Sequence, residues 1–200
     1  MQTIDRVEDL ETLYGDPVPT SLTKVTDRMT PRYRQWIEAA RFVVVSTVGP
    51  EGADGSPRGD DGPVVRIVDD KTLWLPDWRG NNRIDTLRNI MRDGRISLMF
   101  MVPGSNNVVR VNGRAVLTAD TEVTASFDRK GIHPKSVIVV TLDEMYYQCA
   151  KAIMRSGLWT RGDDSEKVPT AGQFVKERDQ DFDGETDDAT YPEYAKTRMW

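Results

Sequence analysis

The chain has 200 residues, 38% hydrophobic content, a formal net charge of −5 and a pI near 5.0. This length suits one domain with appended helices, and the acidic balance argues against a protein that coats nucleic acid. No apolar stretch approaches the roughly 20 residues that cross a bilayer, so no membrane span is expected.

Two helices and intervening loop are predicted for the first forty residues. Apolar residues at helical spacing indicate a helix over 5–13, and Gly15 ends it. Thr30 and Pro31 form a suitable N-cap and first-turn pair for a second helix that extends to Ala40.

The middle of the chain has the pattern of a β-protein. Strands are predicted at 42–48, 64–68, 72–75, 96–102, 108–119 and 136–142. The residues 54–62 read as a polar loop or a strand edge, 69–71 as a hairpin turn, and Asn112-Gly113 as a β-bulge. About six strands, mostly joined by turns, predict a closed antiparallel barrel with flanking helices.

The segment that follows the strand at 72–75 is the most informative in the chain. The strand is predicted to stop at Pro76-Asp77, with a turn over 79–82 and a helix from Arg83. The apolar face of this helix is expected to consist of Ile84, Leu87, Ile90 and Met91. A helix start preceded by a glycine and carrying amide and arginine side chains could hold a phosphate. Alternatively, it could be an ordinary capped helix with its arginines in solvent.

The last fifty residues differ in composition from the barrel. A helix is predicted over 149–158, a linker over 161–167, and a second helix after the N-cap Thr170. The run 180–188 is acidic with few apolar residues, which favours a solvated surface. The aromatic residues Tyr191, Tyr194 and Trp200 are expected to pack on the body or on a second subunit.

The protein's own reactive groups are few. Cys149 and His133 are the only residues of their types, so no multi-histidine or cysteine-rich zinc site is expected. A single cysteine forms no internal disulfide and the N-terminus lacks a signal-peptide pattern, so a cytoplasmic location is expected. No P-loop, dinucleotide fingerprint or acid/base carboxylate pair is evident, and no catalytic residue is identified. A bound cofactor would better explain any chemistry.

Several segments, taken in order, resemble a known family. They are 56–60 (SPRGD), 72–77 (TLWLPD), 80–90 (GNNRIDTLRNI), 100–104 (FMVPG), 110–114 (RVNGR) and 149–159 (CAKAIMRSGLW). Together they closely resemble a bacterial subgroup of the pyridoxamine 5′-phosphate oxidase-like flavoproteins. The resemblance implies a mainly β fold with flanking helices, the split β-barrel, and a homodimer with FMN bound at the interface.

The resemblance also implies a set of FMN-binding residues. Arg58 matches an arginine that reaches the phosphate, although a surface-loop cation is the alternative. Pro76 and Asp77 match a strand end whose backbone lines the flavin ring, and Asn81, Asn82 and Arg83 match a polar, basic trio at the phosphate. Arg155 and Trp159 match residues that reach the partner's flavin, although Trp159 could equally be an interface anchor. The full implied set is Ser56, Arg58, Pro76, Asp77, Asn81, Asn82, Arg83, Arg155 and Trp159.

Two departures separate the chain from the vitamin B6 oxidases of this family. The chain ends in 194–200 (YAKTRMW) rather than in an Arg-Leu-His-Asp-Arg type segment, and Val108 stands where those enzymes have a glutamine. We therefore expect the flavin site and not the B6 substrate site.

The sequence thus predicts an FMN-dependent oxidoreductase that acts on an unidentified small molecule. The alternatives are a flavin-binding module without turnover, or a barrel that binds the deazaflavin F420 or haem. The expected organisation is a helical segment over 1–41 that packs on the barrel, an FMN-binding split barrel over 42–160, and a helical, acidic extension over 161–200.

Overall fold

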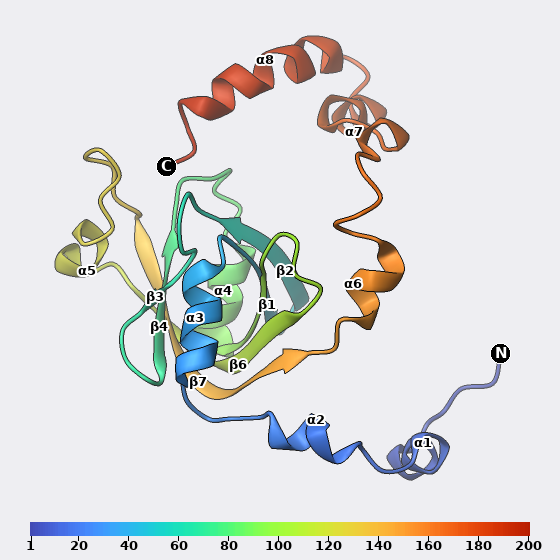
Figure 1. The fold of residues 1–200 in the computed structure, drawn as a ribbon. Helices are drawn as coiled ribbons and strands as arrows, with labels where there is room; N and C mark the ends of the chain where they lie inside the picture. Colours follow the sequence, from blue (N-terminus) through green and yellow to red (C-terminus); the bar gives the residue numbers. More distant parts are fainter.

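Seven strands form one antiparallel sheet whose two edges do not pair with each other (Figure 1). The computed structural model describes residues 1–200. In sheet order β2-β1-β5-β6-β7-β4-β3, the strands are β2 (Gly52–Gly59), β1 (Phe42–Gly49), β5 (Arg95–Met101), β6 (Val108–Thr118), β7 (Ser136–Gln148), β4 (Thr72–Asp77) and β3 (Arg66–Ile67).

The unpaired edges make the barrel a split one. The strand β2 contains Pro57, which has no N–H to donate, and β3 has only two residues. These edges are poorly suited to continue the ladder of hydrogen bonds. The closed barrel expected from the strand count is therefore wrong, whereas the mainly β fold with flanking helices and the split β-barrel implied by the resemblance are confirmed.

Two helices cover the sheet and complete the core. The helix α3 (Pro31–Ala39) begins after the N-cap Thr30, as predicted, and buries Ile37 completely. The helix α4 (Asp85–Arg92) packs against β1 and buries Ile90. Between them lie apolar residues from six of the strands, including the fully buried Phe100 and Leu98 of β5. This close-packed core fixes the positions of the barrel strands, and therefore also the positions of the side chains at the strand ends.

The β-bulge predicted at Asn112-Gly113 is confirmed. The pairing of β6 with β7 shifts register between these two residues. Gly113 has no room for a side chain, because a Cβ there would collide with the carbonyl oxygen of Thr141. The strand β7 is longer than predicted, since it continues beyond Leu142 to Gln148 on the far side of the bulge.

The buried face predicted for α4 is correct for Leu87 and Ile90 and wrong for Ile84 and Met91. The helix begins at Asp85 rather than Arg83, and Ile84 and Met91 are 41% and 72% exposed. The buried residues are Thr86, Asn89 and Ile90, and Leu87 packs against the core beside them. Two of them are polar and meet polar partners on the sheet: Thr86 donates to Asp54 (2.5 Å) and Asn89 donates to Thr47 (3.2 Å). Apolar spacing placed Leu87 and Ile90 correctly but gave no sign that Thr86 and Asn89 are buried, because their hydrogen bonds offset the cost of burying polar groups.

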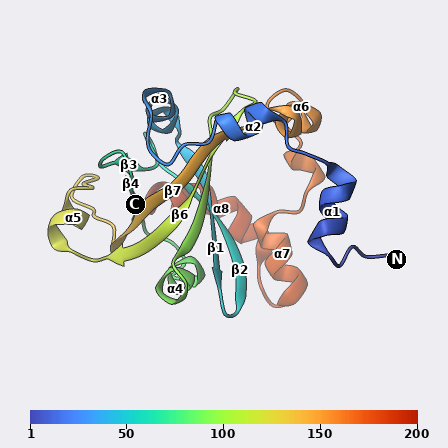
Figure 2. The same ribbon diagram turned by 90° about the horizontal axis from the view of Figure 1, so that it is seen from below.

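The remaining helices lie at the periphery. They are α1 (Val7–Tyr14), α2 (Pro19–Thr23), α5 (Thr121–Ala125), α6 (Lys151–Ser156), α7 (Ala171–Arg178), α8 (Gly184–Lys196) and a 3₁₀ turn (Ser165–Lys167). The helices α1, α2 and α6 bury no residue. Figures 1 and 2 show α1 and the α6–α7 segment extending from the same side of the barrel. No helix is both long and apolar enough to cross a membrane.

The C-terminal helices form a pair of their own. The N-cap of α7 is Thr170, as predicted, and it forms a capping box with Gln173. The backbones of Gly172 and Gly184 are in direct contact, which leaves no room for a Cβ at either position. Trp200 is half-buried, and the Arg129 guanidinium lies 5.7 Å from the centroid of its ring. The division of the chain at residues 41 and 160 stays a prediction.

Candidate functional site

Side chains from β2 and β4 meet across the open edge of the barrel. Ser56 and Arg58 share the face of β2 that lies beside the buried Val45 and Val43 of β1. The Arg58 guanidinium donates from Nη1 to the Ser56 hydroxyl (2.9 Å), and its Nη2 lies 3.4 Å from Oδ1 of Asp77 at the end of β4. The side chains of Arg58 and Asp77 are 28% and 22% exposed. We call Ser56, Arg58 and Asp77 the seam cluster.

A second bridge crosses the same opening. Asp60 follows β2 and accepts hydrogen bonds from Nε1 of Trp78 (2.9 Å) and from Nη2 of Arg129 (2.6 Å). The Asp60 side chain is only 5% exposed. These three residues were not predicted from the sequence, because no local pattern indicates that a loop aspartate, a tryptophan after a strand and a distant arginine will meet.

The seam cluster has unusual electrostatics for a barrel edge. Burial raises the pKa of the Asp77 carboxyl above its usual value of 3.8, while the positive charges of Arg58 and Lys135 oppose that rise. Nε of Arg58 is buried and has no hydrogen-bond partner. An unpaired guanidinium donor beside a hydroxyl and a carboxyl of raised pKa suits an anionic oxygen such as that of a phosphate.

The loop that contains Asn81, Asn82 and Arg83 is arranged differently. All three residues are exposed. Asn81 accepts from the backbone N–H of Arg83 (2.9 Å), and the Arg83 guanidinium pairs with Asp85 (2.5 Å) in the first turn of α4. The start of the helix therefore carries a carboxylate.

Arg83 borders a cavity that does not include the seam cluster. This cavity, of about 420 Å³, is also lined by Asp54, Asp85, Arg88 and Arg92. The single chain thus brings together Ser56, Arg58 and Asp77, and leaves the trio 81–83 as a separate group.

Pro76 precedes Asp77 of the seam cluster on β4, whereas Arg155 and Trp159 lie in and after α6. Pro76 is buried and lines a different cavity, of about 400 Å³, together with Asp60 and Trp78. Trp159 follows α6 and donates from Nε1 to the backbone oxygen of Ser105 (2.8 Å). Arg155 lies exposed on α6. No hydrogen bond or ion pair within the chain joins these three residues to Arg58.

The fold and the sequence define the class of protein. The architecture is that of the split-barrel proteins related to pyridoxamine 5′-phosphate oxidase. A family model described as pyridoxamine 5′-phosphate oxidase matches residues 29–149, which is more than half of the chain. The chain belongs to this family.

The chain is similar to solved structures at low sequence identity. The HupZ protein of Group A Streptococcus is 19% identical with a TM-score of 0.50, and the match covers 60% of this chain and 93% of that chain. An FMN-binding protein from Syntrophomonas wolfei is 12% identical with a TM-score of 0.45, and the match covers 72% of this chain and 97% of that chain. Comparison with curated proteins gives no match.

Proposed function

We propose that the protein is an FMN-dependent oxidoreductase that acts on a small molecule. Membership of the pyridoxamine 5′-phosphate oxidase family supports flavin binding. The observation that carries the proposal is the seam cluster, where the half-buried Arg58 retains an unpaired donor beside Ser56.

The seam cluster fits the phosphate of FMN. Arg58 and Ser56 would hold its oxygens, since an arginine forms short, charge-assisted hydrogen bonds to phosphate. The carboxylate of Asp77 opposes an anion, but its raised pKa reduces the cost of that repulsion because the neutral form is more accessible. The main chain at Pro76 and Asp77 would lie beside the ring.

The loop residues Asn81, Asn82 and Arg83 are proposed to close over the phosphate from the exposed side. Because Arg83 pairs with Asp85 in the free chain, it must leave that carboxylate to reach a phosphate. When bound, FMN supplies the capacity to accept and pass on a hydride or electrons. The protein's part is to orient the ring and the substrate and to exclude water.

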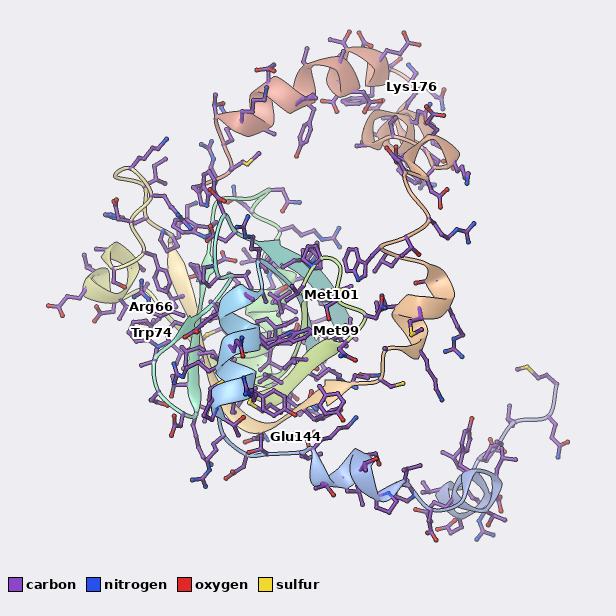
Figure 3. All side chains as sticks on the ribbon, in the orientation of Figure 1. Arg66, Trp74, Met99, Met101, Glu144 and Lys176 are labelled. Carbon is purple, nitrogen blue, oxygen red and sulfur yellow. The ribbon has the colours of Figure 1, made fainter.

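We further propose that the protein is a homodimer whose cofactor site is completed by the partner. Proteins of this family commonly dimerise. Met99 and Met101 of β5 lie on the side of the sheet that faces α6 (Figure 3). A second barrel packed on this side would bring Arg155 and Trp159 of the partner subunit towards the flavin. Sedimentation should give twice the chain mass, and a monomer with full FMN occupancy would contradict this proposal.

The absorption spectrum of the bound cofactor and its reduction by NADH or NADPH distinguish an FMN-dependent oxidoreductase from the alternative functions. The purified protein saturated with cofactor should have the absorption spectrum of a flavin, whereas a deazaflavin or haem spectrum would overturn the cofactor assignment. Reduction by NADH or NADPH, followed by reoxidation with an added acceptor, should bleach and restore the flavin band. A flavin that binds but is neither reduced nor reoxidised would favour a flavin-binding module without turnover.

A further inference from the structure

A cavity of about 550 Å³ lies between α3 and the ends of β6 and β7. Its walls include the aromatic side chains Tyr33 and Trp36 from α3 and Tyr147 from β7, together with Val109 from β6. The volume falls in the range of small-molecule sites, roughly 300–1,000 Å³. None of its lining residues belongs to the proposed flavin site.

Hydrogen bonds fix the walls of this cavity. The hydroxyl of Tyr33 donates to the backbone oxygen of Lys24 (2.8 Å) and accepts from the backbone N–H of Tyr147 (3.1 Å). Thr26 and Met145 exchange two backbone hydrogen bonds (3.0 and 2.7 Å), which join the segment before α3 to β7. The cavity is therefore bounded by elements that are held together without a ligand.

The charge in the cavity is of one sign. Lys24 and Arg32 line it, and no carboxylate does. Neither cation forms an ion pair: Lys24 lies 4.7 Å from the centroid of the Tyr147 ring, and Arg32 donates to the amide oxygen of Gln35 (3.3 Å). Two unpaired cations in an aromatic cavity contrast with the overall net charge of −5.

The two other large cavities differ in this respect. The cavity that contains Arg83 mixes three arginines with Glu51, Asp54 and Asp85. The cavity that contains Pro76 mixes two arginines with Glu38, Asp60 and Asp128. Their cations are balanced by carboxylates of the protein itself, whereas Lys24 and Arg32 are left for an external anion.

We propose that this cavity binds a planar aromatic carboxylate. The ring of the ligand would lie among Tyr33, Trp36 and Tyr147, where aromatic contacts favour a flat apolar group. The carboxylate would lie near Lys24 and Arg32 and form charge-assisted hydrogen bonds with them. This site is additional to the proposed flavin function and does not depend on it.

The test compares two probes of the same shape and different charge. We expect 2-naphthoate to bind the full-length protein saturably, and about tenfold more tightly than the neutral 2-naphthamide, in calorimetric titrations. The double substitution Lys24→Met with Arg32→Gln should weaken 2-naphthoate about tenfold and change 2-naphthamide less than about twofold. Lys151→Met, which removes an exposed lysine from α6, serves as the control and should change neither probe.

Two further variants keep the test specific to this cavity. Trp36→Phe removes an N–H that is buried and has no hydrogen-bond partner, so the variant should fold while altering the aromatic wall and weakening both probes. Arg58→Ala should leave 2-naphthoate binding unchanged, because Arg58 lies outside the cavity. Equal affinity for the two probes, no loss in the Lys24/Arg32 variant, or loss in the Arg58 variant would each overturn the proposal.

Discussion

The seam cluster and the loop 81–83 contain similar chemical groups but differ in how firmly the fold holds them. Arg58 is 28% exposed in its side chain and lies on a strand against the buried β1, with Ser56 and Asp77 in contact. The Arg83 side chain is 80% exposed and forms its ion pair with Asp85, at the start of its own helix. One arginine is positioned by the barrel, and the other is positioned by its local sequence.

The difference in exposure affects how much each arginine contributes to the affinity for a phosphate. A side chain that is already ordered loses little entropy when a ligand arrives, whereas an exposed one loses about 0.5–1.5 kcal/mol on immobilisation. Arg83 must in addition leave its carboxylate partner. We therefore expect Arg58 to contribute more to phosphate affinity than Arg83, even though both would form the same kind of contact.

The largest expected effect concerns the hydrogen bonds that Asp60 accepts from Trp78 and Arg129 across the barrel opening. Asp60→Ala leaves Arg129 and the Trp78 N–H without their buried acceptor, and should lower the free energy of unfolding by about 3 kcal/mol in urea titrations. The neighbouring Asp61→Ala is a matched control, because the Asp61 side chain is 76% exposed and should lose under about 1 kcal/mol. Equal losses in the two variants would show that Asp60 is not a bridge.

The next effect distinguishes the seam from other surface arginines. Arg58→Ala should weaken FMN binding roughly tenfold to a hundredfold, because it removes charge-assisted hydrogen bonds of about 1.5–3 kcal/mol. Arg41→Ala, at a side chain that is 70% exposed, should leave FMN affinity unchanged. Fluorescence titration of FMN against both variants is the measurement. A similar loss in both would indicate general attraction of the phosphate rather than a defined contact.

A smaller effect should appear in the pH dependence of stability. Because burial raises the pKa of Asp77 in the folded state, this carboxyl keeps its proton to a higher pH there than in the unfolded chain, and its contribution to stability falls as the pH rises. In Asp77→Asn this fall is absent, so the stability of the variant relative to the parent should increase between about pH 4 and pH 7. A difference that stays constant with pH would contradict the raised pKa.

The smallest effect is expected in the exposed loop. Arg83→Ala breaks an ion pair whose arginine is 80% exposed, and should change the free energy of unfolding by less than about 1 kcal/mol. Its loss of FMN affinity should be severalfold smaller than that of Arg58→Ala. A larger loss than in Arg58→Ala would reverse the ranking of the two regions.

Local sequence signals predicted a bulge, a turn and a helix cap correctly. The bulge at Asn112-Gly113, the hairpin turn at 69–71 and the N-cap at Thr170 all occur where they were expected. Each depends on residue types with a narrow conformational preference, so the local sequence is sufficient evidence.

Features that depend on distant partners were not predictable from such signals. The buried face of α4 contains Thr86 and Asn89 because Asp54 and Thr47 lie opposite them, and those partners are far away in the sequence. The meeting of Asp60 with Trp78 and Arg129 is of the same kind. The resemblance implied that Arg58 and Asp77 belong to one site, and the fold shows that their side chains contact each other.

The most direct test of the central claim, that Arg58 and Arg83 hold the phosphate of FMN, is a comparison of FMN with riboflavin. The double variant Arg58→Ala with Arg83→Ala should bind FMN on the order of a hundredfold or more weakly than the parent. Riboflavin, which has no phosphate, should bind the parent poorly and the double variant about equally. Circular dichroism establishes that the variant is folded. Unaltered FMN affinity in the folded double variant would contradict the phosphate assignment.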